Sequence, residues 1–157
     1  MSMFLMKQLF KQKASVKSAP KLYIGADHAG FKLKEILKKK ISANWFDVGA
    51  HKLSPKDDYP NFAKKLAKRV AKTKSIGILV CGSGAGMCIA ANRFKKVRAV
   101  VGLDAYEVKM SRLHNDSNVL CLRSRNFPIS KSIALARLWL STPFSKEVRH
   151  VRRIKQL

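Results

Sequence analysis

A cysteine followed at once by a glycine-rich turn is the stretch of this sequence with the clearest chemical potential. Cys81 ends the apolar run 76–80, and the residues from it onward read C-G-S-G-A-G. An apolar run bounded by glycine is typical of a buried parallel strand, and the segment 87–92 after the turn favours a helix. Backbone N–H groups at such a turn bind anions and favour the thiolate form of a neighbouring cysteine. The stretch 75–92 therefore predicts a thiol beside an anion-binding turn.

Other groups that could handle protons or anions lie elsewhere in the chain. Asp27 and His28 follow an early apolar run, and His114 lies in a polar segment ahead of a later one. Arginines that could bind a phosphate follow nearer the C-terminus: Arg123, Arg125, Arg149 and Arg153. This set favours acid–base chemistry on a small anionic molecule. Structural interpretations also exist: Cys81 as a small buried hydrophobe, His114 as a helix-end cap and the arginines as surface charge.

Alternating apolar and amphipathic segments predict the elements that would position these residues. Short apolar runs predict strands at 21–25, 44–48, 76–80, 98–103 and 118–122. Amphipathic segments predict helices at 31–40, 60–71, 87–92, 105–113 and 130–140, and in the basic end 145–157. Regular alternation with short connections predicts a three-layer α/β/α domain, a doubly wound, five-stranded parallel sheet of the Rossmann-like kind with a C-terminal helix.

The order of the strands decides which residues meet. Ligands of such sheets bind beyond the carboxyl ends of the strands, where the strand order reverses. In a sheet ordered 2-1-3 the first and third strands are neighbours, so we expect Asp27, His28 and Cys81 to lie in one crevice. The polar loop 49–59 follows the second strand, and residues 114–116 are expected to form a break before the fifth.

Length and composition suit one domain with a sizeable core. The chain has 157 residues, and we expect residues 1–20, which are basic and contain no acid, to form a flexible extension before a single domain at 21–157. The extension also has a faint resemblance to an organelle transit peptide. No apolar run reaches the length of a membrane span, and three cysteines without metal spacing favour a reducing, cytoplasmic setting.

The formal net charge of +24 raises the question of nucleic acid. The lysines are spread over the predicted helix faces and both ends of the chain. They are not interleaved with aromatic residues, and the sequence has no helix-turn-helix pattern. A solvated, lysine-rich surface accounts for this distribution, so we expect no specific nucleic-acid partner.

Three other chemistries match the glycine-rich turn less well. Asp104 at the end of the next strand suggests a dinucleotide site, but the pattern is G-x-G-x-G and Met87 stands where the third glycine belongs. A phosphatase-type thiol loop needs a nearby arginine, and none occurs between Cys81 and Arg93. A zinc site would have to combine carboxyl, imidazole and thiol groups that lack ligand spacing, so no metal is expected.

Several short motifs, taken in order, resemble the ribose-5-phosphate isomerase B family, which also includes galactose-6-phosphate isomerase subunits. The likeness runs from about Lys21 to Arg153, nearly the whole chain. The motifs are G-A-D-H-A-G-F at 25–31, D-Y-P at 58–60, C-G-S-G-A-G at 81–86, I-A-A-N-R at 89–93, R-A-V-V at 98–101, S-R-L-H-N-D at 111–116 and R-H-x-x-R at 149–153. Each motif is weak alone, but their order makes the set specific.

The resemblance implies an aldose–ketose isomerase that interconverts D-ribose 5-phosphate and D-ribulose 5-phosphate, a reaction of the pentose phosphate pathway, without metal or organic cofactor. Cys81 would carry the proton between C2 and C1 through a cis-enediolate. Some relatives place a glutamate base where this chain has Met87, so this chain resembles the cysteine type. The enediolate oxygens would be held by the turn, Gly82, Ser83, Gly84 and Gly86. An isomerase of a six-carbon sugar phosphate, galactose or allose 6-phosphate, is the nearest alternative.

The remaining site residues are implied by the same resemblance. His114 resembles the residue that opens the sugar ring, assisted by Asp27. Tyr59 and Asn115 resemble substrate-orienting positions. The phosphate ligands would be His28, Arg125, Arg149 and Arg153. Arg123 departs from the family, which usually has glycine or another small residue there.

The predicted topology places His114 far from Cys81 within one chain. His114 precedes the fifth strand and so belongs to the amino end of the sheet, whereas Cys81 lies at the carboxyl end of the third strand. A five-residue strand spans roughly 16 Å, too far for one sugar to contact both side chains. We therefore expect a symmetric homodimer, or a dimer of dimers, in which His114 serves the site of the partner.

Overall fold

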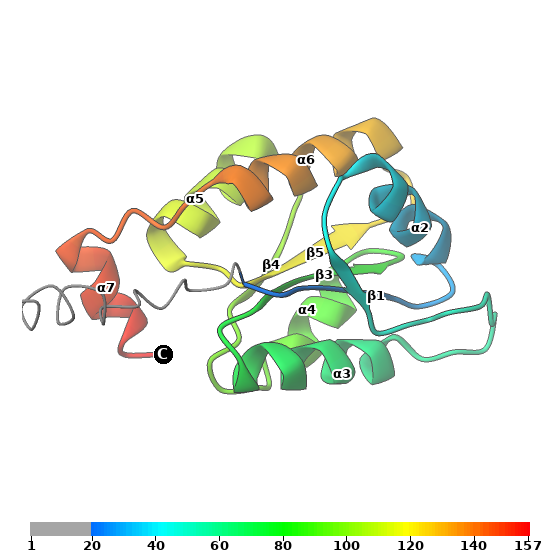
Figure 1. The fold of residues 1–157 in the computed structure, drawn as a ribbon, viewed down its shortest axis with the longest axis horizontal. Coiled ribbons are helices and arrows are strands. Elements are labelled where there is room, and N and C mark those ends of the chain that lie inside the picture. Colours follow the sequence, from blue (N-terminus) through cyan, green and yellow to red (C-terminus); the bar gives the residue numbers. More distant parts are fainter. Residues whose placement is uncertain (1–19) are drawn as a thin grey trace, which may run out of the picture.

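The computed structural model describes residues 20–157, so the predicted extension 1–20 lies, apart from Pro20, outside the described residues. Strands and helices alternate along the described part of the chain (Figure 1). The strands are β1 (Leu22–Ala26), β2 (Trp45–Asp47), β3 (Ile76–Cys81), β4 (Ala99–Val101) and β5 (Val119–Arg123). The helices are α2 (Phe31–Lys40), α3 (Tyr59–Lys72), α4 (Ala85–Ala91), α5 (Ala105–Asn115), α6 (Ile129–Ser141) and α7 (Val148–Ile154).

The strands of the described residues form a single parallel sheet in the order β2-β1-β3-β5-β4. β1 lies between β2 and β3, with Ala26 opposite Val80. On its other side β3 pairs with β5, so that Cys81 lies opposite Arg123. The predicted parallel sheet and the predicted pairing of the first strand with the third are confirmed, and the chain leaves β1, β3 and β5 at the same edge.

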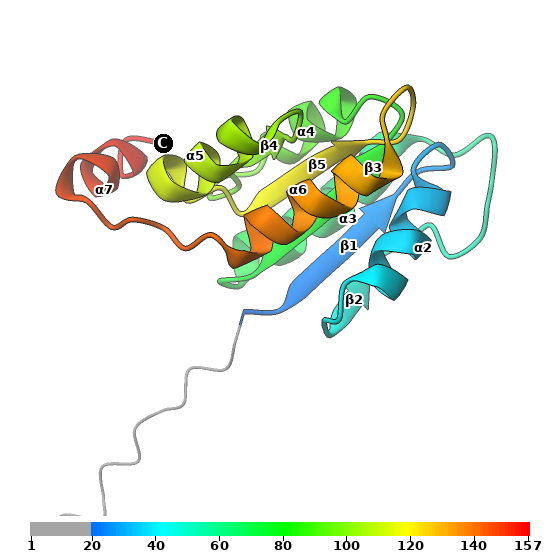
Figure 2. The ribbon, with the colours of Figure 1, turned by 90° about the horizontal axis from the view of Figure 1, so that it is seen from above.

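Helices cover both faces of the sheet and complete the three predicted layers. α3 and α4 pack on one face around Leu66, Val70 and Met87, whereas α2, α5 and α6 pack on the other around Leu37 and Trp139. Figures 1 and 2 show these two groups of helices on opposite sides of the sheet, with α7 apart from both and near α5. Because the central strands are covered on both faces, they consist almost wholly of apolar residues.

The polar segment at residues 114–116 differs from its prediction. The sequence predicts a break there, but α5 continues through Asn115. Asp116 ends the helix in the left-handed conformation, with φ of 45°, and its carboxylate accepts hydrogen bonds from Arg98 at 2.9 Å and Arg112 at 3.0 Å. These charged contacts, one of them long-range, fix the end of α5 at a point that local polarity does not indicate.

Three other predicted elements have shifted or shorter bounds. α4 begins at Ala85 rather than at residue 87, and α7 is shorter than the basic end 145–157. β4 begins after Arg98, whose backbone N–H donates to the Asn118 side chain at 2.8 Å instead of to a neighbouring strand. Local sequence pattern alone does not reveal such a side-chain partner.

One lysine of α2 lies in the core rather than on the surface. Lys34 is fully buried, and its Nζ donates to Asp47 Oδ2 at 2.6 Å and to the carbonyl oxygen of Ala50 at 2.7 Å. Burial opposes ionisation of Asp47, but the ammonium groups of Lys34 and Lys38 hold the pKa of its carboxyl below the ordinary value. These contacts tie α2 to the chain that leaves β2, where the loop 48–58 begins.

Replacing Leu66 with alanine tests the packing of α3 on the sheet. Its side chain is fully buried against β3, and a Cβ added at Gly77 would lie 2.6 Å from Leu66 Cδ2. We expect Leu66→Ala to lower the free energy of unfolding by about 3 kcal/mol because it leaves a cavity. Leu53→Ala, at a leucine that is 60% exposed, should change it by less than about 0.5 kcal/mol. Urea unfolding followed by circular dichroism measures both, and equal losses would contradict this packing.

Candidate active site

A cavity opens at the edge of the sheet where β1, β3 and β5 end. It encloses about 400 Å³ and is lined by Asp27, His28, Ala29, Tyr59, Cys81, Gly82, Ser83, Gly86, Arg123 and Arg125. The structure thus brings Asp27, His28 and Cys81 together, as the predicted strand order requires. The cavity gathers a thiol, a carboxyl, an imidazole and two guanidinium groups, which suits proton transfer on an anionic substrate.

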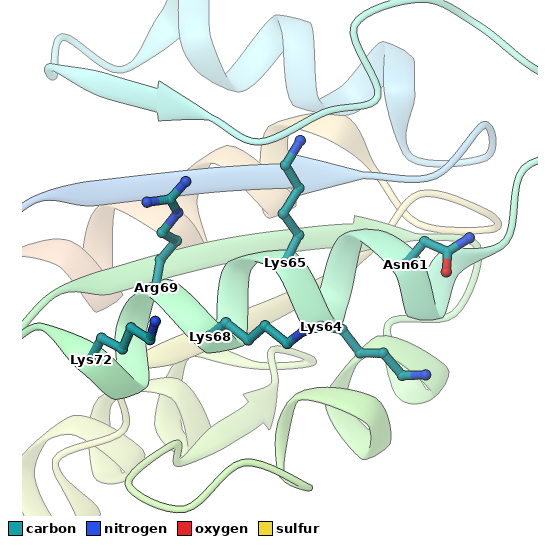
Figure 3. A pocket seen from close by; sticks show the side chains of 6 residues that line it. All are labelled: Asn61, Lys64, Lys65, Lys68, Arg69 and Lys72. Atoms are coloured by element: carbon teal, nitrogen blue, oxygen red, sulfur yellow. The ribbon is translucent and has the colours of Figure 1, made fainter.

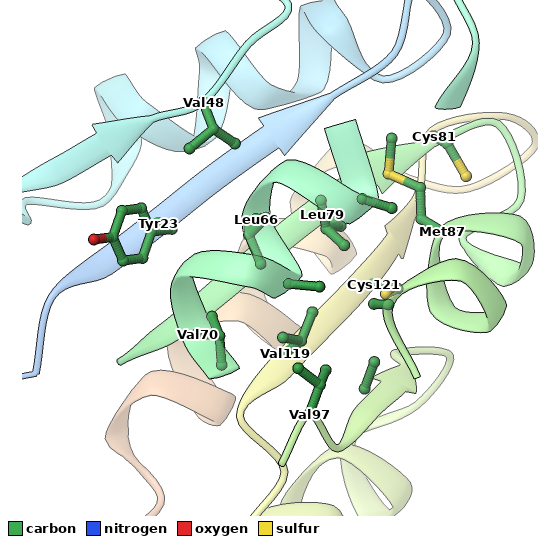
Figure 4. Packing of buried hydrophobic residues seen from close by; sticks show 14 residues of the cluster. Tyr23, Val48, Leu66, Val70, Leu79, Cys81, Met87, Val97, Val119 and Cys121 are labelled. Atoms are coloured by element: carbon green, nitrogen blue, oxygen red, sulfur yellow. The ribbon is translucent and has the colours of Figure 1, made fainter. Parts of the chain in front are cut away.

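The thiol of Cys81 is held by the turn that follows it. Cys81 is 4% exposed and belongs to the same buried cluster as Met87 (Figure 4). The backbone N–H of Gly84 donates to Cys81 Sγ at 3.1 Å. Gly84 has φ of 80°, a left-handed conformation that glycine adopts without steric cost. This conformation turns an amide back onto the sulfur, where it stabilises negative charge.

The members of the turn have different surroundings. Gly82, Ser83 and Gly86 line the cavity, whereas Gly84 is buried and does not. The Ser83 hydroxyl also accepts a hydrogen bond from the Ala85 N–H at 3.3 Å. The backbone of Gly82, Ser83 and Gly86 therefore faces the cavity, whereas the Gly84 N–H donates its hydrogen bond to the thiol.

Asp27 is the buried carboxyl of the cavity. It is 5% exposed, and its Oδ1 accepts a hydrogen bond from the Gly30 N–H at 2.9 Å. Burial raises the pKa of the Asp27 carboxyl, although the Gly30 amide and the charge of His28 favour the ionised form. A carboxyl in this environment takes up a proton more readily than one in water, which suits a group that exchanges protons with a substrate.

His28 is paired with a carboxylate to which the sequence analysis gave no role. Asp57 Oδ1 accepts from the backbone N–H of His28 at 2.8 Å and lies 2.8 Å from its ring Nδ1. The bond to Asp57 is the largest influence on the imidazole and raises the pKa of His28 above its ordinary value of 6.5. A run of polar residues in the loop 49–59 does not single out this contact, because it joins segments that are distant in the sequence.

Tyr59 enters the cavity from the first turn of α3 and packs against the glycine turn. A Cβ added at Gly86 would lie 2.7 Å from Cζ and 3.1 Å from the hydroxyl oxygen of Tyr59. Glycine is therefore required at residue 86 for the ring to keep its place. The contact connects α3 with the start of α4 across the cavity.

Arg123, which the sequence offers as a possible phosphate ligand but the family resemblance does not assign to the site, lines the cavity. It lies directly opposite Cys81 in the pairing of β3 with β5. Its guanidinium group lies 5.7 Å from the centre of the Phe127 ring, and its Nε donates to the carbonyl oxygen of Arg125 at 3.2 Å. Its position at the end of β5, next to β3, brings it to the cavity.

The other predicted site residues lie away from this cavity. Four predicted site residues are absent from the cavity lining: His114, Asn115, Arg149 and Arg153. His114 is in the last turn of α5, and its ring centre is 4.3 Å from that of His150 in α7. His150 is 3% exposed and bonds the Ser145 hydroxyl through Nδ1 at 3.0 Å. α5 ends at the amino edge of the sheet, so a single chain does not bring His114 to Cys81 (Figure 1).

A second depression runs along α3 and is lined almost wholly by basic side chains. It is lined by Asn61, Lys64, Lys65, Lys68, Arg69 and Lys72 (Figure 3). These side chains extend from one helix into solvent, and no thiol, carboxylate or imidazole lies among them. The depression is therefore a solvated basic surface, whereas the thiol, carboxyl and imidazole groups gather in the cavity at the ends of β1, β3 and β5.

The sequence and fold of the chain match those of known proteins. A family model described as ribose/galactose isomerase matches residues 22–157. The chain belongs to this family. It is therefore an aldose–ketose isomerase, as the order of its motifs implied, and the dinucleotide-binding and nucleic-acid-binding alternatives receive no support. The Ribose-5-phosphate isomerase B of Escherichia coli is 36% identical over 144 residues, which are 87% of this chain and 93% of that protein.

Two further members show the range of the family. The ribose-5-phosphate isomerase B of Mycoplasma genitalium, solved with bound ribulose-5-phosphate, has a TM-score of 0.83 and 36% identity over 88% of this chain and 93% of its own. D-erythrulose-4-phosphate isomerase 2 of Mycolicibacterium smegmatis is 38% identical over 82% of this chain and 89% of that protein. The fold is thus that of the family, and the family includes proteins named for sugars of different length.

Residues 20–157 hold no candidate for a membrane span or for a metal site. No helix among them is long and apolar enough to cross a bilayer. No three His, Cys, Asp or Glu side chains of this part of the chain gather in a way that could hold a metal ion.

The contact between Gly86 and Tyr59 predicts a specific loss in isomerase activity. Gly86→Ala should displace the Tyr59 ring and lower kcat/KM by roughly tenfold to a hundredfold, because a small misplacement of a positioning group is costly. Adding Gly86→Ala to a Tyr59→Ala enzyme should cost little more, since the clash is already relieved. Steady-state kinetics of the two single variants and the double variant measure this. An equal loss in both backgrounds would show that Gly86 acts independently of Tyr59.

Proposed function

We propose that the chain interconverts D-ribose 5-phosphate and D-ribulose 5-phosphate in the cytoplasm, as a step of the pentose phosphate pathway, and that residues 21–157 are its isomerase domain. The observation that carries the proposal is the Cys81 thiol, held by the Gly84 amide, in a cavity with Asp27 and His28. Relatives named ribose-5-phosphate isomerase B, one of them solved with ribulose-5-phosphate, support this substrate over a six-carbon sugar phosphate.

Cys81 acts as the base that moves the proton between carbons. Its thiolate takes the proton from C2 of the open-chain aldose, and the electron pair of that C–H bond forms a cis-enediolate with negative charge on O1. The thiol returns the proton to C1, and the O2 proton passes to O1, which leaves a carbonyl at C2. We assign this last transfer to the Ser83 hydroxyl, and the enediolate oxygens to the backbone of Gly82 and Gly86.

Phosphate binding uses the cationic side of the cavity. His28 and Arg125 are the phosphate ligands that this chain supplies to its own cavity, and Arg123 adds positive charge beside them. Tyr59 orients the sugar, and Asp27 assists ring opening by exchanging a proton with the ring oxygen or the anomeric hydroxyl. The cationic side chains of the cavity thus bind the phosphate, whereas the Asp27 carboxyl exchanges protons with the sugar.

The assay that tests the function compares Cys81→Ser with wild type in the conversion of ribose 5-phosphate to ribulose 5-phosphate. We expect kcat to fall by at least about a hundredfold, because a hydroxyl is a much weaker base than a thiolate at neutral pH. Cys88→Ser, at a thiol outside the cavity lining, should retain activity. Full activity in Cys81→Ser would remove Cys81 from the base role. Faster turnover of erythrulose 4-phosphate or allose 6-phosphate by wild type would overturn the substrate assignment.

The active unit that we propose is a symmetric dimer or a dimer of dimers. His114, with Asn115, Arg149 and Arg153, lies outside the cavity of its own chain. His114 and α7 are already in contact, because the tilted rings of His114 and His150 lie with their centres 4.3 Å apart. A two-fold axis would bring this group to the cavity of a second subunit, where His114 opens the sugar ring and the arginines complete the phosphate site.

Complementation between inactive chains tests this shared site. Cys81→Ala and His114→Ala chains, each inactive alone, should form hybrid dimers with one intact site. Random mixing makes half of the dimers hybrid, so activity should recover to about a quarter of wild type. Co-expression with two different affinity tags isolates the hybrids. If purified hybrids remain as inactive as the parents, His114 does not serve the other subunit.

A further inference from the structure

Asp57 is a charged group at the cavity that the proposed isomerisation does not use. It lies in the loop between β2 and α3, and its side chain is 12% exposed. Its Oδ1 accepts the backbone N–H of His28 and engages the ring Nδ1, each at 2.8 Å. Its Oδ2 is buried and has no hydrogen-bond partner within residues 20–157. The hydrogen bonding of this carboxylate is therefore directed entirely to His28.

The two bonds from one oxygen fix both the position and the protonation of the imidazole. The backbone bond holds the loop against the turn after β1, and the ring bond sets the rotation of the side chain. A carboxylate beside Nδ1 requires a proton on that nitrogen, so Nε2 is the ring nitrogen left for a ligand in the cavity. Neutral His28 would then present an unprotonated Nε2, which repels a phosphate oxygen. The imidazolium presents an Nε2–H donor, which binds one.

We infer that Asp57 is a positioning residue that keeps His28 in the imidazolium form with Nε2–H available to the phosphate of the substrate, so that Asp57 sets the upper pH limit of substrate binding. The inference rests on the proposed function in that it takes His28 as a phosphate ligand. It goes beyond that function by assigning the pH range of binding to a residue that does not contact the sugar phosphate.

Charged groups on several elements influence the protonation of His28. Asp27 and Asp57 are the acids beside it, and both favour its protonation. Several groups from the other elements face the same cavity: Tyr59, Cys81, Arg123 and Arg125. The two arginines repel a second cation, so they oppose protonation of His28. The bond to Asp57 is the largest influence on the imidazole and raises the pKa of His28, whereas partial burial lowers it.

The raised pKa of His28 extends phosphate binding to higher pH. A histidine whose pKa is raised stays protonated to higher pH, so phosphate binding persists above the ordinary value of 6.5 and is lost as pH rises through the folded value. Asp57→Asn keeps an oxygen that can accept from both donors but removes the charge. His28 should then lose its proton at lower pH, and binding should weaken at lower pH as well.

A proton NMR titration of the full chain tests the coupling without turnover. The chain has four histidines, and a His28→Gln spectrum assigns the resonance of interest. In Asp57→Asn its midpoint should fall by about one pH unit or more. Asp58→Asn removes the same charge from the next residue, which makes no bond to His28, and should shift the midpoint by much less. An unchanged midpoint in a folded Asp57→Asn protein would overturn the inference.

Binding and kinetics separate positioning from a structural role. With inorganic phosphate as the probe, Asp57→Asn should bind as well as wild type at pH 6 and about tenfold more weakly at pH 8. In the isomerase assay KM should rise at pH 8 and recover at pH 6, with kcat little changed. A loss that low pH does not rescue would assign Asp57 a structural role and overturn the inference. Absence of turnover in wild type would refute the proposed function instead, and the phosphate measurement would still decide the role of Asp57.

Discussion

The parallel pairing of β1 with β3 is the contact on which the site depends. Ala26 lies opposite Val80, and the Asp27 N–H donates to the Val80 carbonyl oxygen at 3.3 Å, so the two strands end together. The chain then crosses so close to β3 that a Cβ at Gly30 would lie 2.1 Å from that same oxygen. This close approach carries Asp27 and His28 to the strand that ends in the thiol. Without it, the acid–base groups would belong to separate surfaces.

The cavity combines charges whose effects on one another are opposed. Asp27 follows β1, Asp57 from the loop after β2 bonds His28 beside it, and Arg123 and Arg125 come from the end of β5. Burial raises the pKa of the Asp27 carboxyl, and the direct contact with the Asp57 carboxylate raises the pKa of the His28 imidazole. Neighbouring titratable groups whose pKa values are shifted by their environments are able to take different roles in proton transfer and anion binding. The α/β scaffold supplies these environments through the short turns at one edge of the sheet.

The opposite edge of the sheet holds a second group of polar residues for a topological reason. Every helical crossover returns the chain to the amino edge before the next parallel strand begins. His114 lies in the last turn of α5, ahead of β5, and α7 packs beside it through His150. One chain therefore carries the predicted site residues in two separate groups, one at each edge of the sheet, and the proposed dimer would bring the two groups together.

The sequence by itself predicted the architecture and most of the residues that line the cavity. Apolar runs that alternate with amphipathic segments predicted the parallel sheet, because strands covered on both faces cannot carry polar residues in their interior. The glycine turn after Cys81 and the polar residues after β1 predicted which side chains meet, because parallel strands end at a common edge. The motifs in their order identified the family.

The tertiary structure alone decided the contacts that join distant segments. The Asp57 bond to His28, the Lys34 bonds to Asp47 and the end of α5 at Asp116 all depend on partners that local periodicity does not encode. The same holds for the Gly84 amide, which the sequence assigned to an enediolate and the structure gives to the thiol. Hydrophobic pattern specifies which face of a segment is buried, whereas hydrogen-bond partners are specified by the geometry that burial creates.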